Sequence, residues 1–166
     1  MFELKPISLE AIPSAMEKAE RYRLLNEPWQ AESICRDIVA REPDNQEALI
    51  ALLLSITDQF KSEGGKRVND AKEILAELEG DYEKAYYAGI IWERRGTAIL
   101  HRRGPGSGAV IYGRLREAME LYERAEELRP QGNDSARLRW NTCARIIMDH
   151  PEIAPDAQPT TPTLLE

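Results

Sequence analysis

Residues 12–45, IPSAMEKAERYRLLNEPWQAESICRDIVAREPDN, decide how this chain folds. Apolar residues recur in this stretch every three or four positions, which is the spacing that one face of an α-helix requires. Asn26 and Pro28 interrupt the first run and Pro43 ends the second, because proline has no amide hydrogen and clashes inside a helix. The stretch therefore predicts two helices joined by a tight turn.

The same periodicity extends along most of the chain. No stretch shows the sustained alternation of apolar and polar residues that is typical of a half-buried β-strand. We predict an all-α protein with seven helices, at about residues 14–25, 28–42, 45–60, 70–79, 81–103, 109–129 and 133–150. Ser14, with Glu17 three residues later, is the expected N-cap of the first helix, and Asp70 is the expected N-cap of the fourth.

Length and composition indicate one soluble domain. The chain has 166 residues, of which 42% are hydrophobic and 31% charged, and a chain of this size buries enough surface to hold a core without a metal or a disulfide. Its longest uncharged apolar run, residues 48–57, is too short to cross a bilayer. The amino terminus shows no signal-peptide pattern, so we expect a cytoplasmic protein in which Cys35 and Cys143 are reduced core residues.

The sequence shows no motif for catalysis, a cofactor or a metal. The GPGSG stretch at residues 104–108 has glycines but lacks the lysine and hydroxyl residue of a phosphate loop, and it follows a helix rather than a strand. His101 and His150 stand alone in the sequence. We therefore expect no enzyme, no cofactor and no metal site.

Two sets of residues share the same intervals of four, three and five positions. They are Ala31, Cys35, Ile38 and Pro43, and Ala118, Tyr122, Ala125 and Pro130. Pairs of a small and an aromatic residue precede them, Ala19 with Tyr22 and Gly89 with Trp92. This pattern resembles the tetratricopeptide repeat, a helix pair of 34 residues. A nonrepetitive helical bundle is the alternative, because alanine-rich helical hairpins can imitate part of the pattern.

The resemblance implies an α-α superhelix of about three helix pairs plus a C-terminal capping helix. The repeat domain would span residues 1–150, and the proline-rich segment 151–166 would be a flexible tail. The third pair carries a 17-residue excess over the family's spacing between Gly89 and Ala118. We expect this excess to lengthen both helices around residues 94–116, so that the hairpin protrudes by about 10 Å, because a helix rises about 1.5 Å per residue.

The resemblance also implies a function, because the family binds segments of partner proteins along the concave side of the superhelix. We expect a scaffold without catalytic activity that binds a peptide or helix in this groove. The register of the repeat places nine residues there: Met16, Glu20, Arg23, Ile50, Leu54, Thr57, Tyr86, Ile90 and Glu93. The alternative is that Ile50, Leu54 and Ile90 belong to the core.

An arginine-rich segment offers a second surface. Residues 94–116 contain Arg94, Arg95, Arg102, Arg103, Arg114 and Arg116 and no acid, although the net charge of the chain is −7. Forked guanidinium donors suit carboxylates or phosphates, so this hairpin could bind an anionic partner. Nucleic acid is less favoured, because the rest of the chain repels phosphate. Pairing with glutamates of adjacent helices is the other interpretation, and the sequence leaves a homo-oligomer open.

Overall fold

The computed structural model describes residues 2–63, 67–102, 104 and 106–155, which form helices and no β-strand. The all-α prediction is confirmed. The α-helices are α1 (Ile12–Leu24), α2 (Pro28–Arg41), α3 (Gln46–Asp58), α4 (Phe60–Glu63), α5 (Val68–Ala76), α6 (Asp81–Arg102), α7 (Gly108–Leu128) and α8 (Ser135–Asp149). Two short 3-10 helices are η1 (Leu9–Ala11) and η2 (Pro151–Ile153). The seven expected helices correspond to all of the α-helices except α4, a single turn that the sequence did not indicate.

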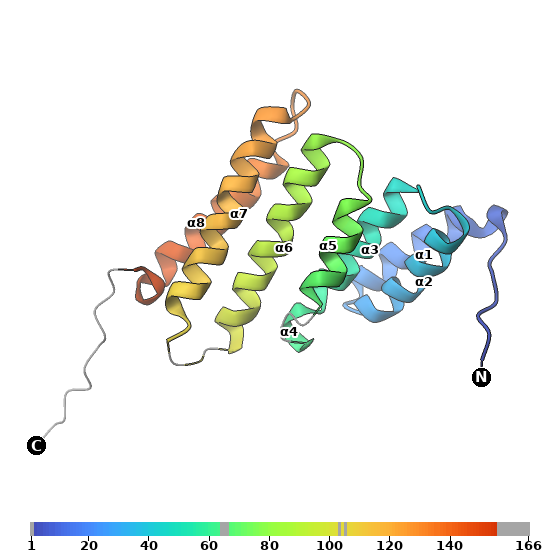
Figure 1. The fold of residues 1–166 in the computed structure, drawn as a ribbon, viewed down its shortest axis with the longest axis horizontal. Coiled ribbons are helices and arrows are strands. Elements are labelled where there is room, and N and C mark those ends of the chain that lie inside the picture. Colours follow the sequence, from blue (N-terminus) through green and yellow to red (C-terminus); the bar gives the residue numbers. More distant parts are fainter. Residues whose placement is uncertain (1, 64–66, 103, 105, 156–166) are drawn as a thin grey trace, which may run out of the picture.

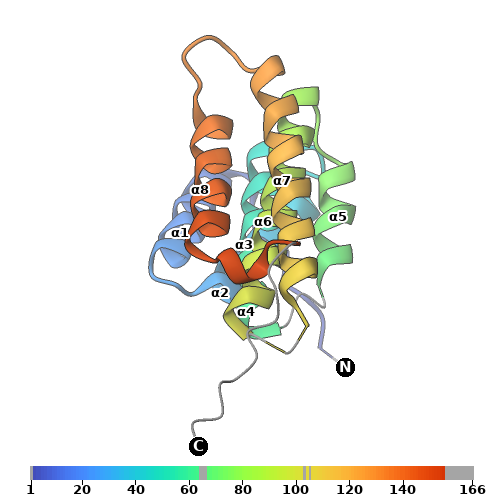
Figure 2. The same cartoon turned by 90° about the vertical axis from the view of Figure 1, so that its left-hand side faces the viewer.

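The helices stand side by side in one row that follows the order of the chain (Figure 1). Helix α1 packs on α2, α2 on α3, α6 on α7 and α7 on α8, while α5 contacts both α3 and α6. Figure 2 shows that α8 lies on the same side of the row as α1, although the two helices are at opposite ends of the chain. Because α1 and α8 lie on the same side, a cleft forms between them, which is the site described below.

The helix ends differ from two of the predicted caps. Ser14 lies inside α1 and donates its hydroxyl to the carbonyl of Ala11, so Ser14 and Glu17 form no capping box. Asp70 lies in the first turn of α5 and accepts a hydrogen bond from Arg67 instead of capping the helix. Asn45 does cap α3, because its side chain accepts a hydrogen bond of 3.0 Å from the Ala48 amide.

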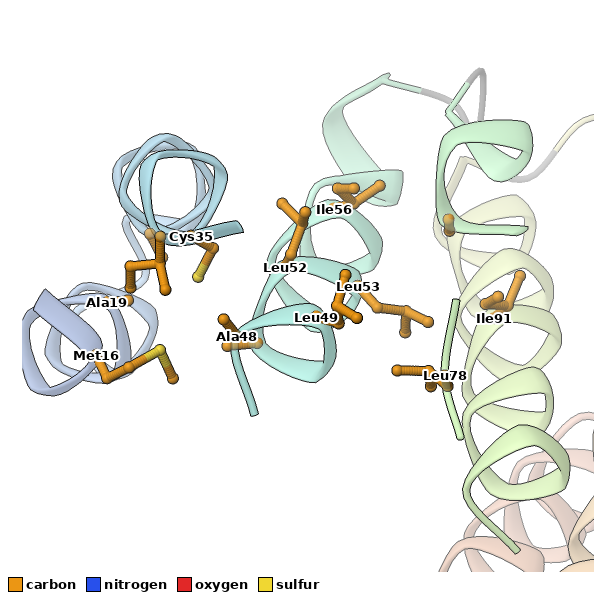
Figure 3. Packing of buried hydrophobic residues seen from close by; sticks show 14 of the residues in the cluster. Met16, Ala19, Cys35, Ala48, Leu49, Leu52, Leu53, Ile56, Leu78 and Ile91 are labelled. Carbon is orange, nitrogen blue, oxygen red and sulfur yellow. The ribbon is translucent and has the colours of Figure 1, made fainter. Parts of the chain in front are cut away.

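Two groups of buried side chains form the core. The first joins α1, α2, α3 and α5 and includes Leu52 and Ile56, as Figure 3 shows. The second joins α6, α7 and α8 around Tyr122. Helix α6 contributes to both groups, and Tyr87 packs against each of them. Cys35 lies in the first group and Cys143 in the second, both fully buried and free, as predicted.

A buried carboxylate links α2 to the segments around α3 and α5. Glu32 accepts hydrogen bonds from Gln59 at 2.7 Å and from Arg67 at 2.6 Å, and Arg36 adds a bond within α2. Burial raises the pKa of the Glu32 carboxyl, but the bonds from Arg67, Gln59 and Arg36 outweigh this effect and lower the pKa to about 2. Glu32 therefore holds its charge in the folded protein and fixes the first helices relative to one another.

Helices α6 and α7 are 22 and 21 residues long, whereas α1 to α3 have 13 or 14. The prediction that both helices continue through the 94–116 segment is confirmed. Trp92 of α6 lies between Lys72 of α5 and Arg114 of α7, with the charged groups 4.5 and 4.6 Å from its ring centre. These cation-π contacts tie three neighbouring helices together.

The far end of the long hairpin is covered on two sides, because α4 packs on α6 and η2 packs on α7. It is therefore not the free projection that we expected. Ile153 of η2 is buried in the second group of the core, and its backbone lies so close to Gly108 that a Cβ there would be 3.2 Å from the Ile153 Cα. The predicted domain boundary at residue 150 is thus too early. The expected tail beyond residue 155 lies outside the described residues.

Candidate partner-binding cleft

A cleft of about 670 Å³ opens between α1 and α8, over the ends of α3 and α6. The α1 side carries Glu20, Arg23 and Leu24, and the α8 side carries Thr142 and Ile146. Its floor comes from α3, α4 and α6: Thr57, Asp58, Phe60, Lys61, Glu93, Arg94 and Thr97. An adjoining hollow of about 350 Å³ shares Lys61 and Thr97 and adds Leu100, His101 and His150. The two hollows are therefore neighbours at Lys61 and Thr97.

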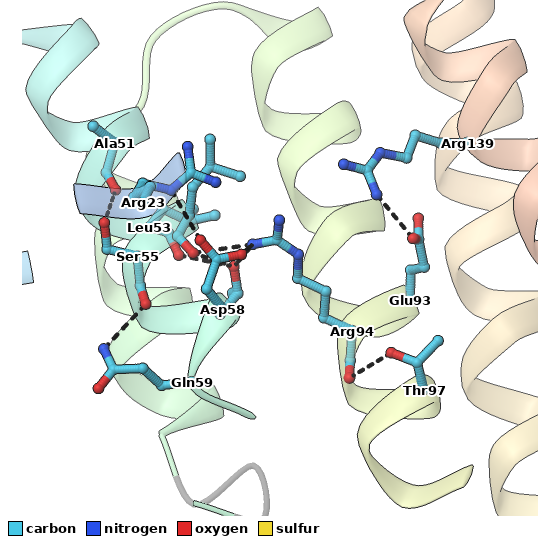
Figure 4. Close-up of polar contacts among 12 residues, drawn as sticks. Arg23, Ala51, Leu53, Ser55, Asp58, Gln59, Glu93, Arg94, Thr97 and Arg139 are labelled. Carbon is cyan, nitrogen blue, oxygen red and sulfur yellow. Dashed lines mark hydrogen bonds and ion pairs between the residues drawn. The ribbon is translucent and has the colours of Figure 1, made fainter. Parts of the chain in front are cut away.

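An ion-pair network occupies the floor of the cleft (Figure 4). Asp58, the last residue of α3, accepts a hydrogen bond of 2.9 Å from Nε of Arg23. It also forms an ion pair with Arg94, whose Nη1 lies 2.8 Å from the carboxylate. The same Arg94 nitrogen donates to Thr57 Oγ1 and to the Leu54 carbonyl. Burial lowers the pKa of Arg94, and the Asp58 carboxylate acts in the opposite direction. One carboxylate thus holds α1, α3 and α6 together.

A second buried carboxylate holds α8 in place. Glu93 of α6 accepts a hydrogen bond of 2.6 Å from the Tyr122 hydroxyl and one of 2.9 Å from Nη1 of Arg139. Burial raises the pKa of Tyr122, and the charge of Glu93 raises it further. Burial lowers the pKa of Arg139, but the Glu93 carboxylate outweighs this effect, so the pKa is raised overall. The network keeps Arg139 charged and anchors α8 beside the cleft.

Tyr122 reaches Glu93 only because residue 89 is glycine. A Cβ on Gly89 would lie 2.5 Å from Cε1 of the Tyr122 ring, well inside van der Waals contact. The small residue at this position therefore allows α6 and α7 to approach closely. The polar network behind the cleft depends on this approach.

Four of the nine predicted groove residues line the cleft: Glu20, Arg23, Thr57 and Glu93. Met16 and Ile90 are buried, because Met16 packs in the first core group and Ile90 in the second. Ile50, Leu54 and Tyr86 are half-buried and pack against the two core groups. For Ile50, Leu54 and Ile90 the alternative interpretation as core applies, whereas Met16 and Tyr86 were expected in the groove and pack in or against the core instead.

Several residues that line the cleft were not among the predicted groove residues. Asp58 and Arg94 each follow a predicted groove residue by one position, so a wider choice of register would have found both. Thr142 and Ile146 belong to α8, and no sequence signal placed that helix across the cleft from α1. Whether these α8 residues line the cleft depends on where tertiary packing places α8.

The predicted hairpin arginines that the structure describes do not share one surface. Arg94 belongs to the floor of the cleft, whereas Arg114 stacks on Trp92 and pairs with Glu117 at 3.0 Å. Arg102 donates to the Ser62 carbonyl at 2.8 Å, Arg116 contacts the Met119 sulfur, and Arg95 is half-buried. Arg103 lies outside the described residues. The described arginines therefore serve mainly in contacts within the protein.

The described residues offer little reactive chemistry. Burial raises the pKa of the Cys35 thiol to about 11 and that of Cys143 to about 12, so neither is an activated nucleophile at neutral pH. Within the described ranges, no group of three or more His, Cys, Asp or Glu side chains has the proximity that a metal ion needs. In the same ranges, no helix combines the length and apolar content required to cross a membrane.

Comparison of the chain with protein-family models, with curated proteins and with solved structures gives no match.

Proposed function

We propose that this chain is a tetratricopeptide-like helical repeat module, without catalytic activity, that binds a segment of a partner protein in the cleft between α1 and α8. The observation that carries the proposal is the cleft itself. It lies over α1, α3 and α6, which are the first helices of the three pairs α1/α2, α3/α5 and α6/α7. A cytoplasmic location accompanies this proposal as an expectation from the sequence.

The burial of the repeat positions supports the repeat register. Six residues at equivalent positions of the first and third pairs are fully buried: Ala31, Cys35, Ile38, Ala118, Tyr122 and Ala125. The small residues Ala19 and Gly89 lie where neighbouring helices approach closely. Equivalent packing at equivalent intervals is what a repeat array requires, because each unit buries its apolar face against the next one.

The lining of the cleft favours a peptide segment over a small molecule. Helices α1 and α8 form two of its walls, and apolar side chains such as Leu24 and Ile146 border a charged floor. Segments in grooves are recognised by a few apolar anchors and by polar contacts along the chain. The alternative of an anionic partner on the 94–116 hairpin lacks such support, because Arg102, Arg114 and Arg116, which lie outside the cleft lining, all make contacts within the protein.

Photo-crosslinking at two positions of α8 tests the proposal. Thr142, which is exposed and lines the cleft, is replaced by a photoreactive phenylalanine derivative, and Arg145, exposed outside the cleft lining, is replaced in a matched control. We expect irradiation in extract of the source cells to link a partner to position 142 and not to position 145. Equal products at both positions, or no product at position 142, would contradict partner binding in the cleft.

A further inference from the structure

We infer that the cleft selects an acidic partner segment that carries a bulky apolar side chain beside its carboxylates. This inference rests on the proposed function and adds the chemistry of the partner. It follows from the internal pairing of the acids on the cleft floor, from one cation that has no partner among the described residues, and from an exposed apolar rim.

The carboxylates of the cleft floor are already neutralised. Asp58 is shared by Arg23 and Arg94, and Glu93 is bound by Tyr122 and Arg139. Within the described residues, Lys61 is then the cation of the floor that has no internal partner, whereas the whole chain carries −7. A ligand with negative charge is therefore attracted to this end of the floor and repelled by most of the remaining surface.

Lys61 provides the cation that the fold itself does not use. Its side chain is exposed, and within the described residues it makes neither a hydrogen bond nor an ion pair. It lines both the cleft and the adjoining hollow, which also contains His101 and His150. The acid that lines the cleft without an internal partner, Glu20, lies on α1 away from this end. We therefore place the partner's carboxylates over Lys61.

Two arginines extend this cationic end toward α1. The side chains of Arg23 and Arg94 keep 24% and 18% of their surface exposed. Arg23 contacts Asp58 through Nε, and its terminal nitrogens make no hydrogen bond among the described residues. Guanidinium groups donate several hydrogen bonds in one plane, which suits carboxylates. A second acidic residue of the partner can therefore bind beside the one at Lys61.

An apolar rim borders the same cations. Leu24, which follows Arg23, lines the cleft and is 88% exposed. Leu25 and Trp29 continue this exposed apolar surface along the turn from α1 to α2, and Ile146 faces the cleft from α8. Exposed large apolar side chains that border a cleft are typical of interaction surfaces. The partner segment should therefore place a leucine or phenylalanine against Leu24.

Fluorescence anisotropy with three synthetic peptides tests the selection. Each has the same length and a fluorescein label: one combines glutamates with leucines, one replaces the glutamates by lysines, and one replaces the leucines by serines. We expect the full-length protein to bind the glutamate-leucine peptide most tightly. Raising the salt concentration should weaken this binding, since ion pairs near the surface are screened.

Paired variants locate the binding. Lys61→Glu should raise the Kd of the glutamate-leucine peptide about five- to tenfold, because an attraction becomes a repulsion. Lys84→Glu is the control, since Lys84 is also exposed and also lacks an ion pair, but lies at the opposite end of α6. Leu24→Ser should weaken binding about threefold or more, whereas Leu138→Ser, at an exposed leucine outside the cleft lining, should not.

The outcomes separate this inference from the proposed function. Tighter binding of the lysine peptide, equal binding of the glutamate and lysine peptides, or equal effects of Lys61→Glu and Lys84→Glu would overturn the acidic selection. Crosslinking at position 142 would still support a partner in the cleft in those cases. Failure of all three peptides together with no crosslinked product would overturn both.

Discussion

At the scale of single residues, the buried carboxylate of Glu32 connects three segments of the chain. Its side chain is 11% exposed and receives donors from Gln59, Arg67 and Arg36. Because the bonding partners come from different segments, the charge of Glu32 stabilises the tertiary arrangement rather than α2 alone. Removing the charge should therefore change global stability.

We expect Glu32→Gln to lower the free energy of unfolding at pH 7 by about 2 kcal/mol, because the buried arginine contacts lose their charged partner. The pKa of the Glu32 carboxyl is about 2 in the folded protein, whereas its ordinary value, which applies to the unfolded chain, is 4.5. Its stabilisation is therefore complete above pH 4.5 and is lost as the pH falls toward 2. Urea unfolding between pH 7 and 3 measures the effect, with Glu120→Gln, at an exposed position, as control. An equal loss at pH 7 and pH 3 would contradict this assignment.

Two glycines of the long hairpin should respond in opposite directions to the same substitution. Gly89→Ala places a methyl group against the Tyr122 ring and should cost about 1–3 kcal/mol of stability. Gly113→Ala meets no atom within 4 Å and should stabilise the protein by about 0.5–1 kcal/mol, since alanine favours a helix. Chemical denaturation of both variants measures the difference. Similar effects of the two substitutions would contradict the close approach of α6 and α7.

At the scale of elements, one ion pair joins α8 to α6, because Arg139 comes from α8 and Glu93 from α6. Helix α8 also packs on α7, and its Ala136 and Cys143 are buried in the second core group. The ion pair therefore adds to this packing in holding the α8 wall of the cleft.

Arg139→Leu should lower stability by about 2 kcal/mol, because it leaves the buried Glu93 charge without its cation; one-third exposure of Arg139 keeps the effect moderate. Adding Glu93→Gln should restore part of the loss, since Gln still accepts from Tyr122. Hydrogen exchange of the α8 amides, with Arg145→Leu as an exposed control, measures the release of the helix. A double variant less stable than Arg139→Leu would argue against the ion pair as the anchor.

At the scale of the whole molecule, the two core groups are joined through α6. Ile91 belongs to the first group and Ile90 to the second, and Tyr87 packs against both. Neither group can lose α6 without exposing apolar surface of the other. The array should therefore unfold as one unit, although repeat arrays can also unfold in parts.

The two cysteines report on this coupling, because each is buried in a different core group. We expect pulsed thiol alkylation in increasing urea to label Cys35 and Cys143 over the same concentration range. Mass spectrometry of the peptides separates the two sites, and far-UV circular dichroism gives the global transition. Labelling of Cys143 well before Cys35 would show that α6 does not couple the two groups.

Much of the fold follows from the sequence alone. Helical periodicity and the breaks at Pro28, Pro43 and Gly80 give the helix order, and the apolar stripe through Ile99 and Ile111 gives the lengthened α6 and α7. These features are local, because a helix depends on residues three or four positions apart. The preference of aspartate for helix N-caps is also a local rule, but at Asp70 it gave a wrong prediction, because the Asp70 side chain pairs with Arg67 instead.

The cleft depends on contacts between residues far apart in the chain. Glu20, Arg23, Thr57 and Glu93 could be named from a repeat register, but Lys61 and the α8 wall could not. The arginine segment had two interpretations, and only packing placed Arg94 on Asp58 and Arg114 on Trp92. Sequence determined which residues are helical and which faces are apolar, because those are short-range properties. Tertiary structure decided which charges meet, since ion pairing and burial depend on how helices distant in the sequence pack together.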